Sequence, residues 1–167
     1  MIYSQACAYC LAALCRLHLH GGGRPVRVAE ICREPGLPAP FVSKIFQTLV
    51  RRGILKSTRG RGGGFMLAKP ATDILIFDVV EAVDGDQGCK MCISGLPHCN
   101  ENQPCALHDR FSPVRAEIIR FMYETTLQDL AKSLATKQDM LARAAGGSGL
   151  ATLSISAGLK KKTPAKK

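Results

Sequence analysis

The chain has 167 residues, and 46% of them are hydrophobic, which is enough to bury a core without the support of disulfides. A formal net charge of +10 and a pI of about 9.4 favour a polyanionic partner, nucleic acid before a membrane surface. The chain starts without the basic segment and cleavage site of a secretory signal, and no apolar run approaches the roughly 18 residues of a membrane span. We therefore expect a soluble, cytoplasmic protein with reduced cysteines.

The first half of the chain has the spacing of a helix-turn-helix. Ser4 is suited to cap a first helix that runs to about His20 and stops at the glycine triplet 21–23. A short second helix is predicted over 26–34, before Pro35 and Gly36. A longer third helix is predicted over 39–52, with an apolar stripe and Gly53 after its end. A short helix, a tight turn and a longer helix indicate a helix-turn-helix.

A β-hairpin is predicted directly after the third helix. Residues 54–57 and 65–68 have the pattern of two short strands, and the glycine-rich turn 58–64 between them carries Arg59 and Arg61. A hairpin in this place is typical of a winged helix, in which the third helix enters the major groove and the wing reaches sugar, phosphate or the minor groove. The predicted fold class is mainly α with a small β-hairpin wing, followed by a long C-terminal dimerisation helix.

Positive charge concentrates in the same segment. Between residues 24 and 69, ten basic side chains face only Glu30 and Glu34. A charged helix face can arise by coincidence, but here the basic segment and the motif coincide. The residues expected to contact bases or phosphates lie on the third helix and the hairpin turn: Ser43, Lys44, Gln47, Arg51, Arg59 and Arg61.

The second half divides into a helix, a cysteine-rich loop and further helices. Residues 74–83 are predicted to be helical. A long amphipathic helix follows from Pro113, with Val114, Ile118, Phe121 and Met122 on a stripe suited to a partner helix, and 127–134 continues it or forms a short final helix. We expect a winged-helix domain over 1–84, a cysteine-rich metal or cluster loop over 85–110, a dimerisation helix region over 111–143 and a disordered basic tail over 144–167.

The cysteine-rich loop carries a dense set of metal ligands. Residues 89–108 have the pattern C-x2-C-x6-C-x5-C-x2-H, formed by Cys89, Cys92, Cys99, Cys105 and His108. Thiolates and imidazole suit a structural zinc ion, and three thiolates with a fourth ligand suit an iron–sulfur cluster. A metal-free thiol switch would need only neighbouring thiols. The residue types alone do not choose among these three chemistries.

The combination of motifs resembles the Rrf2 family of bacterial winged-helix regulators, which includes IscR, NsrR and RirA. The resemblance rests on the wing RGRGGGF, the segment FDVVEAVDG and the closing CALH, and it spans roughly residues 1–134. It implies a homodimer that binds DNA with an affinity set by a two-iron or four-iron cluster. By the same resemblance Cys92, Cys99 and Cys105 are cluster ligands, and His108 is the fourth ligand as in IscR-like members.

Other cysteines have simpler expected roles. The six-residue gap between Cys92 and Cys99 is longer than is usual in the family, and Cys89 is an additional candidate ligand. Cys7 and Cys10 are expected to pack as small apolar residues at a dimer seam, whereas Cys15 and Cys32 are expected in the core. An isolated loop histidine such as His98 is expected to be solvated.

The predicted function is that of a homodimeric transcription regulator, not an enzyme. It would bind a palindromic double-stranded operator and sense redox state, nitric oxide or iron and cluster supply through an iron–sulfur cluster. The alternatives are the same DNA-binding dimer with structural zinc or with a thiol switch. A thiol-redox enzyme is disfavoured, because neither Cys89–Cys92 nor Cys7–Cys10 has the context of a helix start after a strand.

Overall fold

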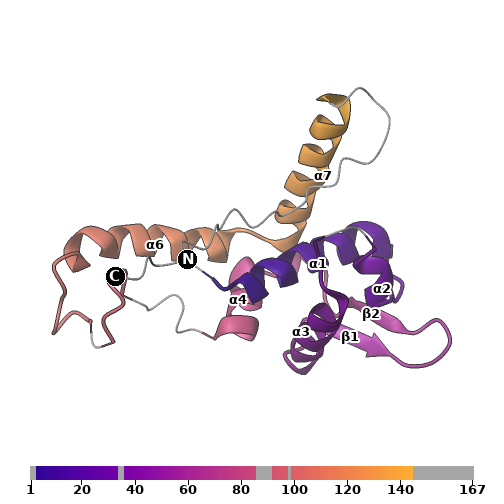
Figure 1. Ribbon diagram of the computed structural model, residues 1–167, viewed down its shortest axis with the longest axis horizontal. Helices are drawn as coiled ribbons and strands as arrows, with labels where there is room; N and C mark the ends of the chain where they lie inside the picture. Colours follow the sequence, from indigo (N-terminus) through magenta and orange to yellow (C-terminus); the bar gives the residue numbers. More distant parts are fainter. Residues whose placement is uncertain (1–2, 34–35, 86–91, 98, 145–167) are drawn as a thin grey trace, which may run out of the picture.

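The computed structural model describes residues 3–33, 36–85, 92–97 and 99–144 (Figure 1). In chain order the elements are α1 (Gln5–Gly21), α2 (Val28–Ile31), α3 (Ala39–Arg51), β1 (Leu55–Thr58), β2 (Gly64–Leu67), the 3-10 turn η1 (Ala71–Asp73), α4 (Ile76–Asp84), α6 (His108–Glu124) and α7 (Leu127–Ala144). The predicted fold class, mainly helical with one antiparallel hairpin, is confirmed. None of these helices, within the described residues, is both long and apolar enough to cross a membrane.

Helix α1 is fixed by its caps and by a buried face. The backbone N–H of Cys7 donates to Ser4 Oγ at 3.1 Å, and Gly22 ends the helix in the left-handed conformation with φ 54°. Cys7 and Cys10 are fully buried in the core of this single chain. The prediction that they pack at a dimer seam is wrong, because seam residues would be exposed in a single chain.

Helix α2 is shorter than predicted. Val26 and Phe65 exchange both backbone hydrogen bonds at 2.8 Å, so this end of the segment extends the hairpin and the helix begins only at Val28. The buried Arg16 of α1 donates from Nη1 to the carbonyl of Ile31 at 3.3 Å, which fastens the end of α2 to α1. The helix-turn-helix therefore rests on α1 as its support.

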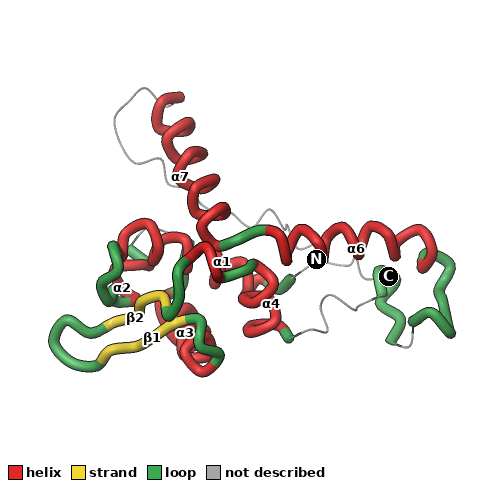
Figure 2. The backbone as a smooth tube through the Cα atoms, turned by 180° about the vertical axis from the view of Figure 1, so that it is seen from behind, coloured by secondary structure: helices red, strands yellow, loops and turns green. Residues whose placement is uncertain are grey.

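The hairpin packs against α3 through aromatic contact. The strands pair from Leu55 with Leu67 to Thr58 with Gly64, and the Phe65 ring meets Phe46 edge-on with centroids 5.3 Å apart. Gly64 is required by space, since a Cβ there would lie 2.4 Å from the carbonyl oxygen of Val26. Figure 2 shows the hairpin leaving the body beside α3.

One core joins α1, α3, the hairpin, α4 and the start of α7. Its largest fully buried side chains include Leu14, Val26, Val42, Phe46, Leu49, Leu55, Ile74, Val79, Val80, Met122 and Leu127. Cys15 belongs to this core as predicted, and Cys32 is half-buried against it. The winged helix thus has a core that does not depend on the cysteine-rich loop.

Helix α6 begins at His108, earlier than the predicted start at Pro113, and Pro113 lies inside it. Proline commonly marks a helix start, but inside α6 Pro113 instead removes one backbone hydrogen bond. Residues 127–134 do form a separate final helix, one of the two predicted alternatives, but α7 is longer than predicted and runs over 18 residues to Ala144.

Two backbone hydrogen bonds hold the turn between α6 and α7 against the segment 74–76 before α4. Ile76 N–H donates to Thr125 O at 3.0 Å, and Leu127 N–H donates to Ile74 O at 2.8 Å. From this corner α6 leads away from the winged helix and carries the cysteine-rich loop at its far end (Figure 1).

Candidate metal centre and DNA interface

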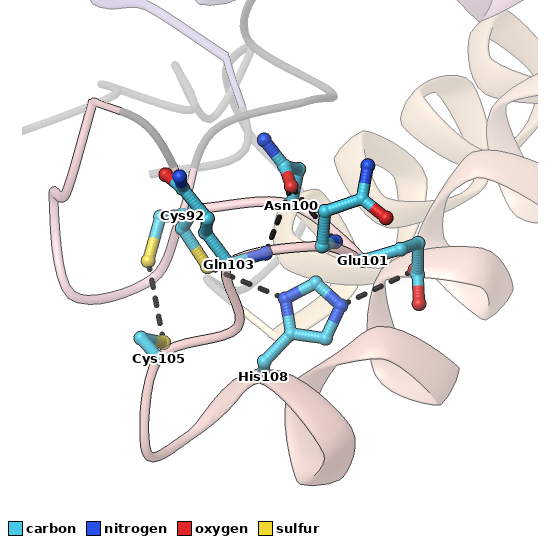
Figure 3. A network of polar contacts seen from close by, with 8 residues as sticks. Cys92, Asn100, Glu101, Gln103, Cys105 and His108 are labelled. Atoms are coloured by element: carbon cyan, nitrogen blue, oxygen red, sulfur yellow. Dashed lines mark hydrogen bonds and ion pairs between the residues drawn. The ribbon is translucent and has the colours of Figure 1, made fainter.

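Three cysteines of the loop converge. The sulfur atoms of Cys92, Cys99 and Cys105 all lie within 4.8 Å of one another, and Cys92 Sγ is 3.5 Å from Cys105 Sγ (Figure 3). The described cysteines are all free thiols. Soft sulfur donors at this spacing form a candidate metal site.

Tight turns bring these thiols together. Gly95 N–H donates to Cys92 O at 2.9 Å, which closes a turn after the first cysteine. Asn100 Oδ1 accepts the N–H groups of Asn102 at 2.9 Å and of Gln103 at 3.0 Å, which closes a second turn between Cys99 and Cys105. Backbone and amide contacts therefore hold the turns at residues 92–95 and 100–103.

His108 stands beside the cysteines as the first residue of α6. Its side chain is 4% exposed, and its Nδ1 lies 3.3 Å from Cys99 Sγ. On the other edge of the ring, Nε2 lies 3.2 Å from Glu101 Oε1 (Figure 3). The sequence prediction missed Glu101, because a single acidic residue in a polar loop gives no signal until the fold brings it to the histidine.

The thiols do not ionise alike. The backbone N–H of Leu96, the N–H of Ser94 and the neighbouring thiols lower the pKa of Cys92 to about 6, although burial opposes this. The backbone of Cys105 lowers the pKa of Cys99, but burial and the two other thiols outweigh it, so that this pKa is raised. The lowered pKa of Cys92 favours its thiolate, the form that binds metals.

Not all of the other predicted ligands and cysteines are described by the structure. Cys89 and His98 fall outside the described residues. Burial raises the pKa of Cys7 and of Cys15 to about 12 each, and it also raises that of Cys10. These buried neutral thiols pack as apolar groups in the core, and among the described residues they do not belong to the sulfur triad.

The predicted DNA-contacting residues lie on α3 and at the hairpin tip. Lys44, Gln47 and Arg51 are exposed on α3, and Ser43 is half-buried. Arg51 Nη2 donates to Thr48 Oγ1 at 3.0 Å, which holds its side chain along the helix. Arg59 and Arg61, the remaining two, are exposed in the turn between β1 and β2.

Comparison with known proteins shows the family of this chain. The family model Rrf2, described as an iron-dependent transcriptional regulator, matches residues 3–133. The chain belongs to the Rrf2 family. An HTH-type transcriptional regulator of Aquifex aeolicus is similar to this Rrf2 protein, with 36% identity over 133 residues that cover 78% of this chain and 91% of the relative. The regulator IscR of Photorhabdus laumondii is 28% identical over 125 residues, which cover 75% of this chain and 76% of the relative.

Solved structures agree with this placement. IscR of T. potens has a TM-score of 0.63 and 25% identity, and the match covers 81% of this chain and 89% of that one. CymR, the global cysteine regulator of B. subtilis, shares the fold with a TM-score of 0.64 and 24% identity, covering 78% and 95%. This Rrf2 protein is a DNA-binding transcription regulator with a winged helix, and the prediction that it is not an enzyme is confirmed.

The donor set in this Rrf2 protein suits iron or zinc. Three sulfur atoms converge, and one imidazole nitrogen lies beside one of them. In a tetrahedral site with metal–sulfur bonds of about 2.3 Å, neighbouring sulfur atoms lie about 3.8 Å apart. The 3.5 Å between Cys92 Sγ and Cys105 Sγ is close to that separation. The residues present therefore fit a metal centre.

Proposed function

We propose that this Rrf2 protein acts as a homodimeric regulator of a palindromic operator, and that an iron–sulfur cluster held by Cys92, Cys99, Cys105 and His108 sets its DNA affinity. The observation that carries the proposal is the convergence of these four donors at the start of α6. The iron dependence named in the family description and the similarity to IscR regulators support iron as the metal.

The chain's own residues prepare the loop for such a group. Cys92 supplies a thiolate because its sulfur accepts backbone N–H groups. His108 is buried at the helix start, so its ring has little freedom to turn away. A bound iron–sulfur cluster would supply redox chemistry and sensitivity to oxidants, nitric oxide or iron supply.

DNA recognition is assigned to residues 1–84. In this proposal α3 enters the major groove, where Ser43, Lys44 and Gln47 reach base edges and phosphates, and Arg51 contacts the backbone. Arg59 and Arg61 at the hairpin tip would contact phosphate or the minor groove. The concentration of exposed basic side chains on these two elements supports this assignment.

Dimerisation is assigned to residues 111–143, chiefly to α6. The apolar side chains of Val114, Phe121 and Tyr123 on α6 are about half exposed, at 49%, 57% and 48%. Because α6 leads away from the body, a second copy could pack along it (Figure 1). His108 is both loop ligand and first helical residue, so a change in the loop would shift α6 and with it the spacing of the two α3 helices on half-sites about one DNA turn apart.

Anaerobic purification tests the cofactor. The protein as isolated should contain iron and acid-labile sulfide and should show visible charge-transfer absorption. The Cys99→Ala variant should lose all three and remain folded. Protein with no iron, no sulfide and no visible absorption in strictly anaerobic preparations would remove the cluster from the proposal.

A structural zinc ion is the second candidate. The compact triad favours it, because sulfur atoms within 4.8 Å of one another already suit ligands of a single tetrahedral ion. Stoichiometric zinc in place of iron in the same preparations would establish this alternative.

A further inference from the structure

Glu101 faces His108 from the side opposite Cys99. The histidine ring lies between the two, with Nδ1 3.3 Å from Cys99 Sγ and Nε2 3.2 Å from Glu101 Oε1 (Figure 3). The two ring nitrogens therefore meet groups of different chemistry. A carboxylate only accepts hydrogen bonds, whereas a thiol both donates and accepts them weakly.

This arrangement selects one form of the ring. A neutral imidazole carries its proton on one nitrogen and a lone pair on the other. The carboxylate of Glu101 favours the proton on Nε2, which leaves the lone pair of Nδ1 facing the sulfur triad. We propose that Glu101 is a positioning residue that fixes the tautomer and orientation of His108, so that Nδ1 is the nitrogen that ligates the metal.

Backbone and amide hydrogen bonds of the surrounding loop fix the positions of His108 and Glu101. The N–H of His108 donates to Cys105 O at 2.9 Å, which ties the histidine backbone to a second thiol residue. Glu101 lies inside the turn that Asn100 Oδ1 closes by accepting from Gln103 at 3.0 Å. Histidine ligands commonly donate their second N–H to a carboxylate, and loss of such a partner costs about 10- to 100-fold in metal affinity. The Glu101 side chain is 86% exposed, so we expect a loss of about tenfold, at the low end of that range.

The tautomer can be measured on the reduced, metal-free full chain. Long-range proton–nitrogen correlation spectra of protein with ¹⁵N-labelled histidine, recorded at about pH 8 where imidazoles are ordinarily neutral, should show His108 with its proton on Nε2. Glu101→Ala should shift the population toward a mixture of tautomers, and Glu101→Gln, whose amide oxygen still accepts, should largely restore it. A His108 proton on Nδ1 in the wild type, or spectra that are the same in Glu101→Ala, would overturn the inference.

Metal affinity gives an independent readout with Zn²⁺ alone as the probe. Competition with a chromophoric chelator should show Zn²⁺ affinity about tenfold weaker in Glu101→Ala. It should be unchanged in Glu30→Gln, a control on another exposed carboxylate, which pairs with Arg24 near α2. In a His108→Ala background, Glu101→Ala should have no further effect, because the carboxylate acts through the ring. An equal loss in both backgrounds would show a merely structural role and contradict the proposal.

The metal partner in this inference rests on the proposed function, but its tests do not require a cluster. Protein that assembles no iron–sulfur cluster would contradict the proposed function, while the tautomer and the Zn²⁺ cycle would still decide the role of Glu101. Protein that assembles the cluster but binds it through Nε2 of His108 would leave the proposed function intact and overturn this inference.

Discussion

Replacing Phe121 with alanine should separate the two protomers. The ring is 57% exposed in the single chain, which corresponds to about 115 Å² if a phenylalanine offers about 200 Å². At about 25 cal/mol per Å², full coverage by a partner helix would contribute about 3 kcal/mol from each copy. Truncation to alanine removes roughly two thirds of this, about 4 kcal/mol for the symmetric pair, so the dimer Kd should rise about 100- to 1000-fold.

Sedimentation velocity over a dilution series measures this change. Phe41→Ala is the matched control, because Phe41 is an aromatic residue on α3 that is 39% exposed and contacts Tyr9 away from α6. It should leave the Kd unchanged. A Phe121→Ala dimer within about threefold of the wild-type Kd would refute the assignment of α6 as the interface, since threefold is only about 0.7 kcal/mol.

Three further variants test separate parts of the account. Arg59→Ala should weaken operator binding and reduce the slope of log K against log salt concentration by about 1, while leaving any cluster absorption intact. An unchanged affinity would remove the wing from the mechanism. Cys105→Ala should abolish metal binding but leave a folded dimer with a Tm within a few degrees, because Cys105 lies outside the core; a collapsed fold by circular dichroism would instead indicate a structural metal. Cys7→Ala should flatten the alkaline loss of stability: burial raises the pKa of Cys7 from 9.0 to about 12, so the unfolded chain loses this proton first as pH rises above 9. Between about pH 9.5 and 11, the free energy of unfolding measured with denaturant should decrease with pH in both proteins, and the decrease should be about 1.4 kcal/mol per pH unit smaller in Cys7→Ala than in wild type. Equal slopes in the two proteins would show that the thiol ionises in the folded state.

Local signals carried most of the fold prediction. The cap at Ser4, the apolar stripe of α3 and the glycine-rich hairpin turn each act over a few residues, and the structure has all three. The shortening of α2 was not predictable in this way, because it depends on Val26 pairing with Phe65, far along the chain. Single-residue signals misled at Pro113, which α6 accommodates inside the helix.

The candidate site was predictable in its donors but not in their arrangement. Cysteine and histidine spacing identified a group of five donors that includes Cys89, and the family resemblance singled out Cys92, Cys99, Cys105 and His108. The fold brings these four together. Which ring nitrogen faces the thiols depends on the turn that brings Glu101 to the other edge of the ring, and sequence spacing does not encode that contact. Burial of Cys7 within the chain likewise depends on packing between helices.

The most direct test of the central claim compares DNA affinity with and without the cluster. An operator is first selected from random duplex DNA with the purified protein, and its Kd is then measured anaerobically at fixed salt for cluster-loaded protein and for the same protein after cluster removal. The account predicts that the two Kd values differ at least about tenfold, a change of about 1.4 kcal/mol in binding free energy. Equal affinities for fully loaded and cluster-free dimers would contradict it.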